Sequence, residues 1–411
     1  MRPLKVYLDS SDFSSLSDPR QLARGLDSIL QFLRQSINDG RIKCYYSATH
    51  ICEMAPLQAA YADASQRRAD LLVELCGRNA MVSQDVLFDA ELSYALDSSA
   101  PRPQIIAPEG DWFPDGLEDI SPTGMQQFGA SLQESIGDMN LNRKARRLAD
   151  RKAFKRGKPR AALRNAAVSN ARYGSLAEML QIYPMRPQDA RVLSRYAVGD
   201  ATPAEATAAL RESLRDPHWM MLWFEKHHAK LTPFIDWVRS PAVEMKKNLD
   251  EMALQATSMR QLDLTFGTNF AEDYFASLKW AEMQEELLVR IAIRLSQPLG
   301  RSGQELTSLI IDERCPGLSV GVRSLHSAWR STTFTAPRKV KLSDFPDALH
   351  AMYAPYVDIF RADSFMAPLI QKHSHKFGTT IVSKVIGLPH AIELAFQVLA
   401  GDTQSDSLDS A

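Results

Sequence analysis

The chain has 411 residues, of which 45% are hydrophobic and 24% are charged, and its formal net charge at pH 7 is −1. These values are ordinary for a soluble globular protein, and the length allows two or more domains or one domain with a large insertion. The chain has no run of about 18 apolar residues and no secretory signal, and its four cysteines lack CxxC spacing. The sequence therefore predicts a cytoplasmic protein with free thiols, without a membrane span or a cysteine-based zinc site.

Strand and helix patterns alternate over the first part of the chain. Residues 5–9, KVYLD, are rich in β-branched and aromatic side chains and predict a short buried strand. An amphipathic pattern that begins at Pro19 predicts a helix over 19–37. Residues 41–46 predict a second strand, and a helix that carries Glu53 follows it. This order predicts a parallel sheet with right-handed crossovers.

The same alternation returns near the C-terminus. Here the sequence predicts a helix that begins near Asp347, a strand over 357–361 and a helix after Asp363. A last short strand is predicted over 379–382 and a last helix over 389–399.

The two ends of the chain therefore predict the halves of one α/β domain, residues 1–90 and 310–400. Between them, residues 91–309 predict a mostly helical insertion that opens with a proline-rich loop. Neither half is large enough to bury a sheet on both faces alone, which favours the split domain over three separate domains, the alternative. The polar residues 401–411 predict a disordered tail.

A strongly basic segment, residues 143–164, lies within the predicted insertion. It carries eleven Lys and Arg residues against one acid, Asp150, in a chain that is acidic elsewhere. Such a segment indicates a polyanionic partner, although a solvated linker has the same composition. The candidate nucleic-acid-binding residues are Arg143, Lys144, Arg146, Arg147, Arg151, Lys152, Lys155 and Arg156.

Four acids share one position relative to the predicted strands. Asp9 and Asp363 follow strands, and Glu53 and Asp347 lie at the starts of helices. Because ligands of parallel sheets bind beyond the carboxyl ends of the strands, we expect the four carboxylates to converge there. Clustered carboxylates repel one another unless a cation neutralises them, and an all-oxygen set suits Mg²⁺ or Mn²⁺. Taken singly, each acid is better explained as a helix cap than as a ligand, and it is the four together that favour a metal site.

The segments around these acids resemble a PIN-like nuclease domain, a member of the PIN domain superfamily. The resemblance rests on VYLDSS, YYSATHICE, DALHAM and VDIFRAD, and it covers about 90 residues at each end of the chain. The stretch SDFPDALHAMYAPYVDIFRAD is similar to the C-terminal signature of bacterial PIN-like proteins, and CPGLSVGVRSL looks like the segment before it. Arg361 stands where many members have threonine, and Ser364 stands where lysine is common.

The resemblance implies a Rossmann-like parallel sheet and metal-dependent cleavage of nucleic acid, with RNA the commoner substrate. It implies that Asp9, Glu53, Asp347 and Asp363 form the catalytic, metal-binding set. Further residues are candidates with two interpretations each. Asp358 is an auxiliary metal ligand or the first residue of a strand, and Ser11 orients Asp9 or touches the metal. His350 contacts phosphate, holds Asp347 or has a structural role, and Asp12 is interpreted as a cap.

The sequence thus predicts a Mg²⁺- or Mn²⁺-dependent endoribonuclease, in which two metals flank the scissile phosphate. By family analogy, a bacterial toxin or an antiphage defence effector fits such a nuclease with an added helical region. One alternative is a non-catalytic nucleic-acid- or protein-binding module that keeps the fold, and another is a structure-specific DNA nuclease. The expected partner is nucleic acid, RNA before DNA, and no membrane, while a regulatory partner or a homo-oligomer is also open.

Overall fold

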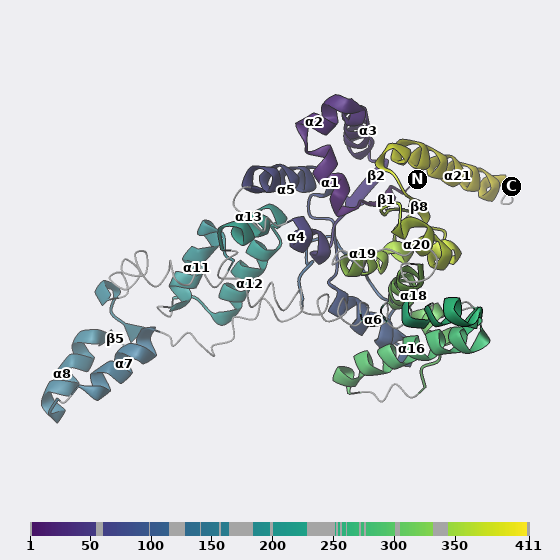
Figure 1. The fold of residues 1–411 in the computed structure, drawn as a ribbon. Coiled ribbons are helices and arrows are strands. Elements are labelled where there is room, and N and C mark those ends of the chain that lie inside the picture. Colours follow the sequence, from purple (N-terminus) through teal and green to yellow (C-terminus); the bar gives the residue numbers. More distant parts are fainter. Residues whose placement is uncertain are drawn as a thin grey trace. The chain divides into compact units, whose positions relative to one another are not determined.

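The chain forms two compact units in the computed structural model (Figure 1). One unit contains Met1–Pro114 and His228–Ala411, and the other contains Asp115–His227. None of the described helices combines the length and the apolar character needed to cross a membrane. The structure describes residues 2–54, 61–97, 99–114, 128–139, 141–155, 158–163, 184–197, 200–227, 251, 254, 257–259, 261–270, 273–274, 277–300, 305–331 and 344–408.

The first unit is built on a four-stranded parallel sheet with strand order β2-β1-β7-β8. These strands are β1 (Leu4–Tyr7), β2 (Ile42–Tyr45), β7 (Ile359–Arg361) and β8 (Thr380–Val382). The N-terminal and C-terminal parts of the chain therefore share one sheet through the pairing of β1 with β7. The chain is mixed α/β and mostly helical, and the expected parallel sheet is confirmed.

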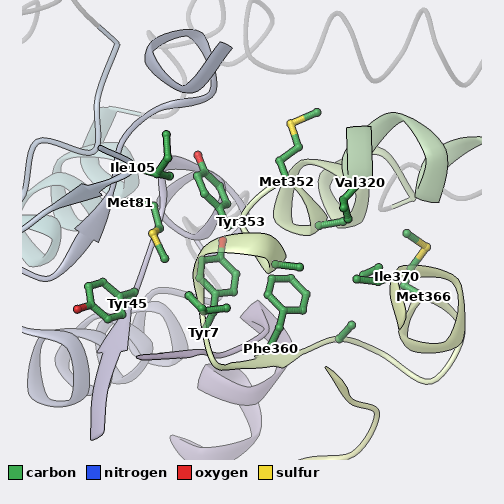
Figure 2. Close-up of a cluster of buried hydrophobic side chains, with 14 of the residues drawn as sticks. Tyr7, Tyr45, Met81, Ile105, Val320, Met352, Tyr353, Phe360, Met366 and Ile370 are labelled. Carbon is green, nitrogen blue, oxygen red and sulfur yellow. The ribbon is translucent and has the colours of Figure 1, made fainter. Parts of the chain in front are cut away.

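Both faces of this sheet are buried, as expected for parallel strands. The register aligns Tyr45, Tyr7 and Phe360 across one face, where the Tyr7 and Phe360 rings stack with centroids 5.0 Å apart. Figure 2 shows these two rings side by side in the core below Tyr353. On β1 the alternate residue Val6 faces the other way and is also fully buried.

Helices cover the two faces of the sheet (Figure 1). Helices α3 (Asp27–Asn38) and α21 (Leu388–Leu408) contact each other and the strands on one face. Helices α18 (Pro316–Arg330), α19 (Asp344–Ala351) and α20 (Met366–Ser374) pack together and contribute to the aromatic core on the other face.

Other short elements complete the first unit. Tyr46 at the end of β2 forms a parallel bridge to Ala80 in β3, which pairs antiparallel with β4. The elements concerned are α1 (Ser10–Leu16), α4 (Ala48–Met54), α5 (Ala62–Cys76), β3 (Ala80–Met81), α6 (Gln84–Leu96), β4 (Ile106–Ala107), η3 (Gln297–Leu299), η5 (Ala354–Tyr356), η6 (His375–Phe377) and η7 (Val385–Gly387).

The expected insertion and the compact units have different boundaries. Helices α16 (Leu278–Ser296) and α17 (Ser308–Arg314) pack on α18 and α6 within the first unit. The Arg323 guanidinium of α18 bonds Glu285 of α16 at 2.6 Å and Asp312 of α17 at 3.0 Å. Charge pairs and a shared apolar cluster thus join part of the predicted insertion 91–309 to the sheet-containing unit.

The second unit is helical apart from one small hairpin. Helices α11 and α12 pack against each other, and Met220, Met221, Trp223 and Phe224 of α13 are buried. Its elements are α7 (Phe128–Asp138), α8 (Arg143–Ala153), β5 (Phe154–Lys155), β6 (Lys158–Pro159), α11 (Pro187–Ala197), α12 (Pro203–Leu214) and α13 (Pro217–His227).

Two predicted elements differ from the structure. The helix over 19–37 is interrupted at Gly25, whose φ of 112° lies outside the helical region, so α2 (Pro19–Gln21) and η1 (Leu22–Leu26) precede α3. The disordered tail predicted over 401–411 is wrong for its first part, because α21 continues through Leu408. Residues 409–411 lie outside the described residues. No proline follows Pro389 to end this helix.

Helix α18 approaches its neighbours closely at Gly317. A Cβ atom there would lie 2.7 Å from the Met352 backbone oxygen and 2.9 Å from Glu91 Oε1. The buried Glu91 carboxylate accepts hydrogen bonds from the backbone N–H groups of Gly317, at 2.6 Å, and Leu318, at 3.0 Å. The CPGLSVGVRSL segment therefore places glycine where a helix N-terminus meets a buried acid and a backbone carbonyl.

The substitution G317A is expected to lower the free energy of unfolding by about 1–3 kcal/mol, because the added methyl group overpacks this contact. Chemical denaturation followed by circular dichroism measures the change. The matched control is G137A in α7, where an added Cβ meets nothing within 4 Å, so that variant should be at least as stable as wild type. Equal stability of G317A and wild type contradicts the close approach.

Candidate metal and catalytic site

Asp9 lies directly after β1 and caps helix α1. Its Oδ1 accepts a hydrogen bond of 2.7 Å from the Ser11 N–H, and its own N–H donates to Asp12 Oδ2 at 3.0 Å. The Asp9 side chain also accepts from the Asp12 N–H, and the reciprocal bonds between Asp9 and Asp12 form a capping box. Asp9 therefore has the capping role that its position predicts, at the carboxyl end of a central strand.

Glu53 connects three distant parts of the chain. It lies on α4, after β2, and its Oε2 accepts hydrogen bonds from Ser10 Oγ at 2.7 Å and from His350 Nε2 at 2.8 Å. Burial alone raises the pKa of Glu53, but the bonds from His350 and Ser10 outweigh it and lower this pKa below its usual value. The Glu53 carboxylate is thus charged and held between α1 and α19.

Asp347 lies one turn before His350 on α19, and the charges of the other three acids affect its pKa. Burial raises the pKa of its carboxyl to about 8, and His350 opposes this increase. The negative charges of Glu53, Asp363 and Asp9 raise this pKa further. The carboxylates of Glu53, Asp363 and Asp9 are therefore near enough to affect the charge of Asp347, although Glu53 and Asp347 are far apart in sequence.

Asp363 lies in the short connection between β7 and α20. Its Oδ1 accepts hydrogen bonds from the backbone N–H groups of Phe365, at 3.0 Å, and Met366, at 2.6 Å. Because β7 pairs in parallel with β1, Asp363 and Asp9 follow neighbouring strands at the same edge of the sheet. The predicted position of the fourth acid at a strand end therefore matches its location.

The donor set suits a hard cation, but it is not assembled as a ready-made cluster of acids. Glu53 uses Oε2 for both of its hydrogen bonds and Asp363 uses Oδ1, so the second oxygen of each has no hydrogen bond to a described residue. Carboxylate oxygens of this kind fit Mg²⁺ or Mn²⁺. Within the described residues, however, no three His, Cys, Asp or Glu side chains are grouped closely enough to hold an ion. Binding by several of the acids requires these side chains to move together.

A buried ion pair lies beside the acids. Asp12 is 2% exposed and Arg361 is 8% exposed, and Arg361 Nη2 lies 3.1 Å from Asp12 Oδ1. Burial raises the pKa of Asp12 to about 7 although Arg361 opposes the increase. Arg361 Nε and Nη1 have no hydrogen-bond partner among the described residues. The capping role expected for Asp12 is present, and the ion pair with Arg361 adds to it.

A network of buried polar side chains supports the site. His350 Nδ1 lies 2.6 Å from the Tyr7 hydroxyl, which lies 2.7 Å from Ser47 Oγ. His50 accepts a hydrogen bond from the Ser47 N–H at its Nδ1 and donates to the Leu8 carbonyl from its Nε2. Burial, together with the nearby His350, lowers the pKa of His50 to about 3 and keeps this ring neutral.

Sequence reasoning did not identify Tyr7, Ser10, Ser47 or His50 as part of the site. Their residue types fit ordinary core packing and capping, so each has an adequate structural explanation when considered alone. The one available signal is their position, because they flank the same strand ends as Asp9 and Glu53. His350, for which contact with phosphate, support of Asp347 and a structural role were all open, bonds Glu53.

Two of the predicted auxiliary residues have other locations. Asp358 lies just before β7, at the opposite edge of the sheet from Asp363, and bonds Arg2 at 2.6 and 2.7 Å and the Lys5 N–H at 2.7 Å. This placement agrees with the interpretation of Asp358 as the first residue of a strand and not as a metal ligand. Ser11 is exposed, and it is the neighbouring Ser10 whose hydroxyl reaches Glu53.

The basic residues predicted to bind nucleic acid belong to the second unit. Helix α8 begins at an Asn142 cap and is followed by the β5–β6 hairpin, and Arg160 of this region donates to the Arg151 carbonyl at 3.1 and 2.9 Å. Arg156 lies outside the described residues. The exposed cations are Arg143, Lys144, Arg146, Arg147, Arg151, Lys152 and Lys155.

Comparison of the chain with protein-family models, with curated proteins and with solved structures finds no match in any of the three.

Asp347 is expected to make stability depend on pH in the absence of divalent ions. Its carboxyl has an ordinary pKa of 3.8 and a pKa of about 8 in the folded chain, so the folded state binds this proton more tightly. Its contribution to stability is therefore fully present below about pH 4 and is lost as the pH rises to about 8. With a chelator present, the melting temperature should decline less between pH 4 and pH 8 for D347N than for wild type. Parallel pH profiles of the two proteins contradict the assignment.

Proposed function

We propose that the chain is a metal-dependent nuclease with a PIN-like fold and that RNA is its substrate. The observation that carries the proposal is the junction of Ser10, Glu53 and His350 at 2.7 and 2.8 Å. This junction draws together α1, α4 and α19, the helices that carry or follow three of the four acids. Side chains from both ends of the chain therefore contribute to one acidic region at the carboxyl edge of a parallel sheet.

The sheet supports the proposed fold. Its order β2-β1-β7-β8, with two strands from each end of the chain, agrees with the Rossmann-like sheet that the resemblance to PIN-like domains implies. The resemblance is supported further by Asp9 and Asp363, which follow two paired parallel strands, and by Glu53 and Asp347, which lie on α4 and α19. The departure at Arg361 leaves all four carboxylates in place.

The chemistry proposed for these acids is phosphodiester hydrolysis. A bound Mg²⁺ or Mn²⁺ supplies an activated water and stabilises negative charge on the phosphate oxygens. Asp9 and Asp363 would hold the ion from rigid strand ends, because each is fixed by backbone N–H groups. Glu53 would be oriented through Ser10 and His350, and Asp347 would ionise more readily once a cation offsets the neighbouring charges.

The exposed cations of α8 and the β5–β6 hairpin support a polyanionic substrate. Nucleic acids bind such surfaces because lysine and arginine displace the counterions of the phosphates. One aromatic residue, Phe154, accompanies the cations, which disfavours base stacking as the main contact. A role as a bacterial toxin or an antiphage effector remains a proposal by analogy with the family.

A second candidate function is nucleic-acid binding without cleavage. It is favoured by one observation: Glu53 is already bonded to two side chains, and the described part of the chain holds no ready-made group of acids for an ion. A protein that binds RNA and cleaves neither RNA nor DNA in the presence of Mn²⁺ would support it.

The substitutions D9N and D363N are each expected to reduce Mn²⁺-dependent cleavage by about a hundredfold or more, since even residues that only orient metal ligands contribute about 10–100-fold. Nucleic-acid binding, measured by filter retention, should be unchanged. The matched control is D358N, which removes an acid from the opposite end of β7 and should retain wild-type cleavage. Incubation with single-stranded RNA, transfer RNA and branched DNA identifies the substrate class. Equal cleavage by D9N, D363N and wild type rejects the site.

Neutralising the exposed cations of α8 is expected to weaken RNA binding and to reduce the salt dependence of that binding. Each phosphate contact contributes about 0.7 to the slope of log K against log salt for single strands, so replacing Arg143, Arg147 and Arg151 by Gln should reduce this slope by about 2. Titrations at several salt concentrations measure it. Replacing Arg195, which lies 3.9 Å from Glu205 in the same unit, serves as the control and should leave the slope unchanged. An unchanged slope in the triple variant indicates a solvated surface.

A further inference from the structure

Three polar atoms at the proposed site have the mutual spacing of ligands on one metal ion. Ser10 Oγ lies 2.7 Å from Glu53 Oε2 and 3.3 Å from His350 Nε2, and Glu53 Oε2 lies 2.8 Å from His350 Nε2. Ligand atoms about 2.1 Å from an octahedral ion and adjacent to one another are about 3 Å apart. The three atoms therefore match one face of an octahedron, made by a hydroxyl, a carboxylate and an imidazole.

His350 is held in the manner of a metal-binding histidine. Histidine ligands usually engage their second ring nitrogen with an oxygen that fixes the orientation of the ring. Here Nε2 faces Glu53 and Ser10, while Nδ1 lies 2.6 Å from the Tyr7 hydroxyl. The imidazole is 5% exposed, so its orientation is set by these contacts and not by solvent.

Tyr7 is itself fixed in place. Its side chain is fully buried, its ring stacks on Phe360, and its hydroxyl also contacts Ser47 Oγ at 2.7 Å. Burial, together with the nearby Tyr353, raises the pKa of Tyr7 well above its ordinary value, so the hydroxyl keeps its proton. A neutral phenol accepts from or donates to Nδ1, and it thereby orients the ring.

The neighbouring His50 provides an internal contrast. Its ring centroid lies 4.6 Å from that of His350, but both of its nitrogens are engaged by backbone groups, the Ser47 N–H and the Leu8 carbonyl. His50 is thus structural. His350 differs because its Nε2 contacts a carboxylate and a hydroxyl that are both partly accessible to solvent.

We propose that His350 Nε2, Glu53 and Ser10 Oγ bind the metal ion directly, with Tyr7 as the positioning residue, so that the site prefers Mn²⁺ to Mg²⁺. This inference rests on the proposed function, which it deepens by adding a nitrogen ligand to the acids. Imidazole suits transition ions, whereas Mg²⁺ favours oxygen ligands. On binding of the ion, Nε2 would release its proton to solvent and coordinate through its lone pair, and the exposed side of Glu53, 24% accessible, would give the ion a route of entry.

The test measures metal binding by the full chain directly. Mn²⁺ affinity is obtained from the electron paramagnetic resonance signal of free Mn²⁺, and Mg²⁺ affinity from its competition with Mn²⁺. H350Q should lower Mn²⁺ affinity by about a hundredfold while changing Mg²⁺ affinity less, and Y7F should lower Mn²⁺ affinity by about tenfold. The matched control is Y353F, another buried tyrosine of the same core, whose hydroxyl donates to the Val82 carbonyl; it should bind Mn²⁺ as wild type does.

Electron spin-echo spectroscopy of bound Mn²⁺ supplies the decisive readout. Wild type should show the ¹⁴N modulation of a coordinated imidazole, and H350Q should lose it while its thermal unfolding stays cooperative. Bound Mn²⁺ without imidazole modulation, or equal losses of Mn²⁺ and Mg²⁺ affinity in H350Q, overturns the inference and leaves the nuclease proposal standing. Imidazole-bound Mn²⁺ without any cleavage of nucleic acid supports the inference and rejects the nuclease. Wild type that binds neither ion rejects both.

Discussion

The parallel pairing of β1 with β7 is the contact on which the rest of the first unit depends. It brings residues separated by more than half of the chain into adjacent strands, and it aligns Tyr7 with Phe360 across the sheet. Because the strands are parallel, both of their carboxyl ends lie at one edge, where Asp9 and Asp363 follow. The aromatic core on one face and the acidic region at the edge are therefore two results of one register.

The strands and the acids were predictable because they depend on local patterns. The run KVYL indicates a buried strand by its side chains alone, and an acid directly after a strand is placed at the sheet edge by topology. The interruption at Gly25 was not predictable, since the apolar spacing of 19–37 is compatible with a continuous helix. The packing of α16 on α18 was equally unpredictable from the sequence. It involves ion pairs of Arg323 with acids on two other helices, which no local pattern indicates.

The candidate site, like the fold, was predictable from the sequence only in part. Sequence position indicates which acids are neighbours, but it does not indicate what each carboxylate oxygen contacts. Ser10 and Ser11 are identical in type and adjacent in sequence, and the helical geometry of α1 directs Ser10 to Glu53. His350 faces Glu53 and not Asp347 because Tyr7 fixes its ring from behind, a contact between residues 343 positions apart. Such details are set by packing across the sheet, which no local pattern records.

The buried pair of Asp12 and Arg361 has a consequence for how this chain can change over evolutionary time. Removing one partner leaves an uncompensated buried charge, which costs several kcal/mol, whereas replacing both with well-packed apolar residues is often neutral. Positions 12 and 361 are therefore constrained to vary together. A relative of this chain with an uncharged residue in place of Arg361 should have lost the acid at position 12 as well, so these two positions are expected to covary even where the four site acids stay constant.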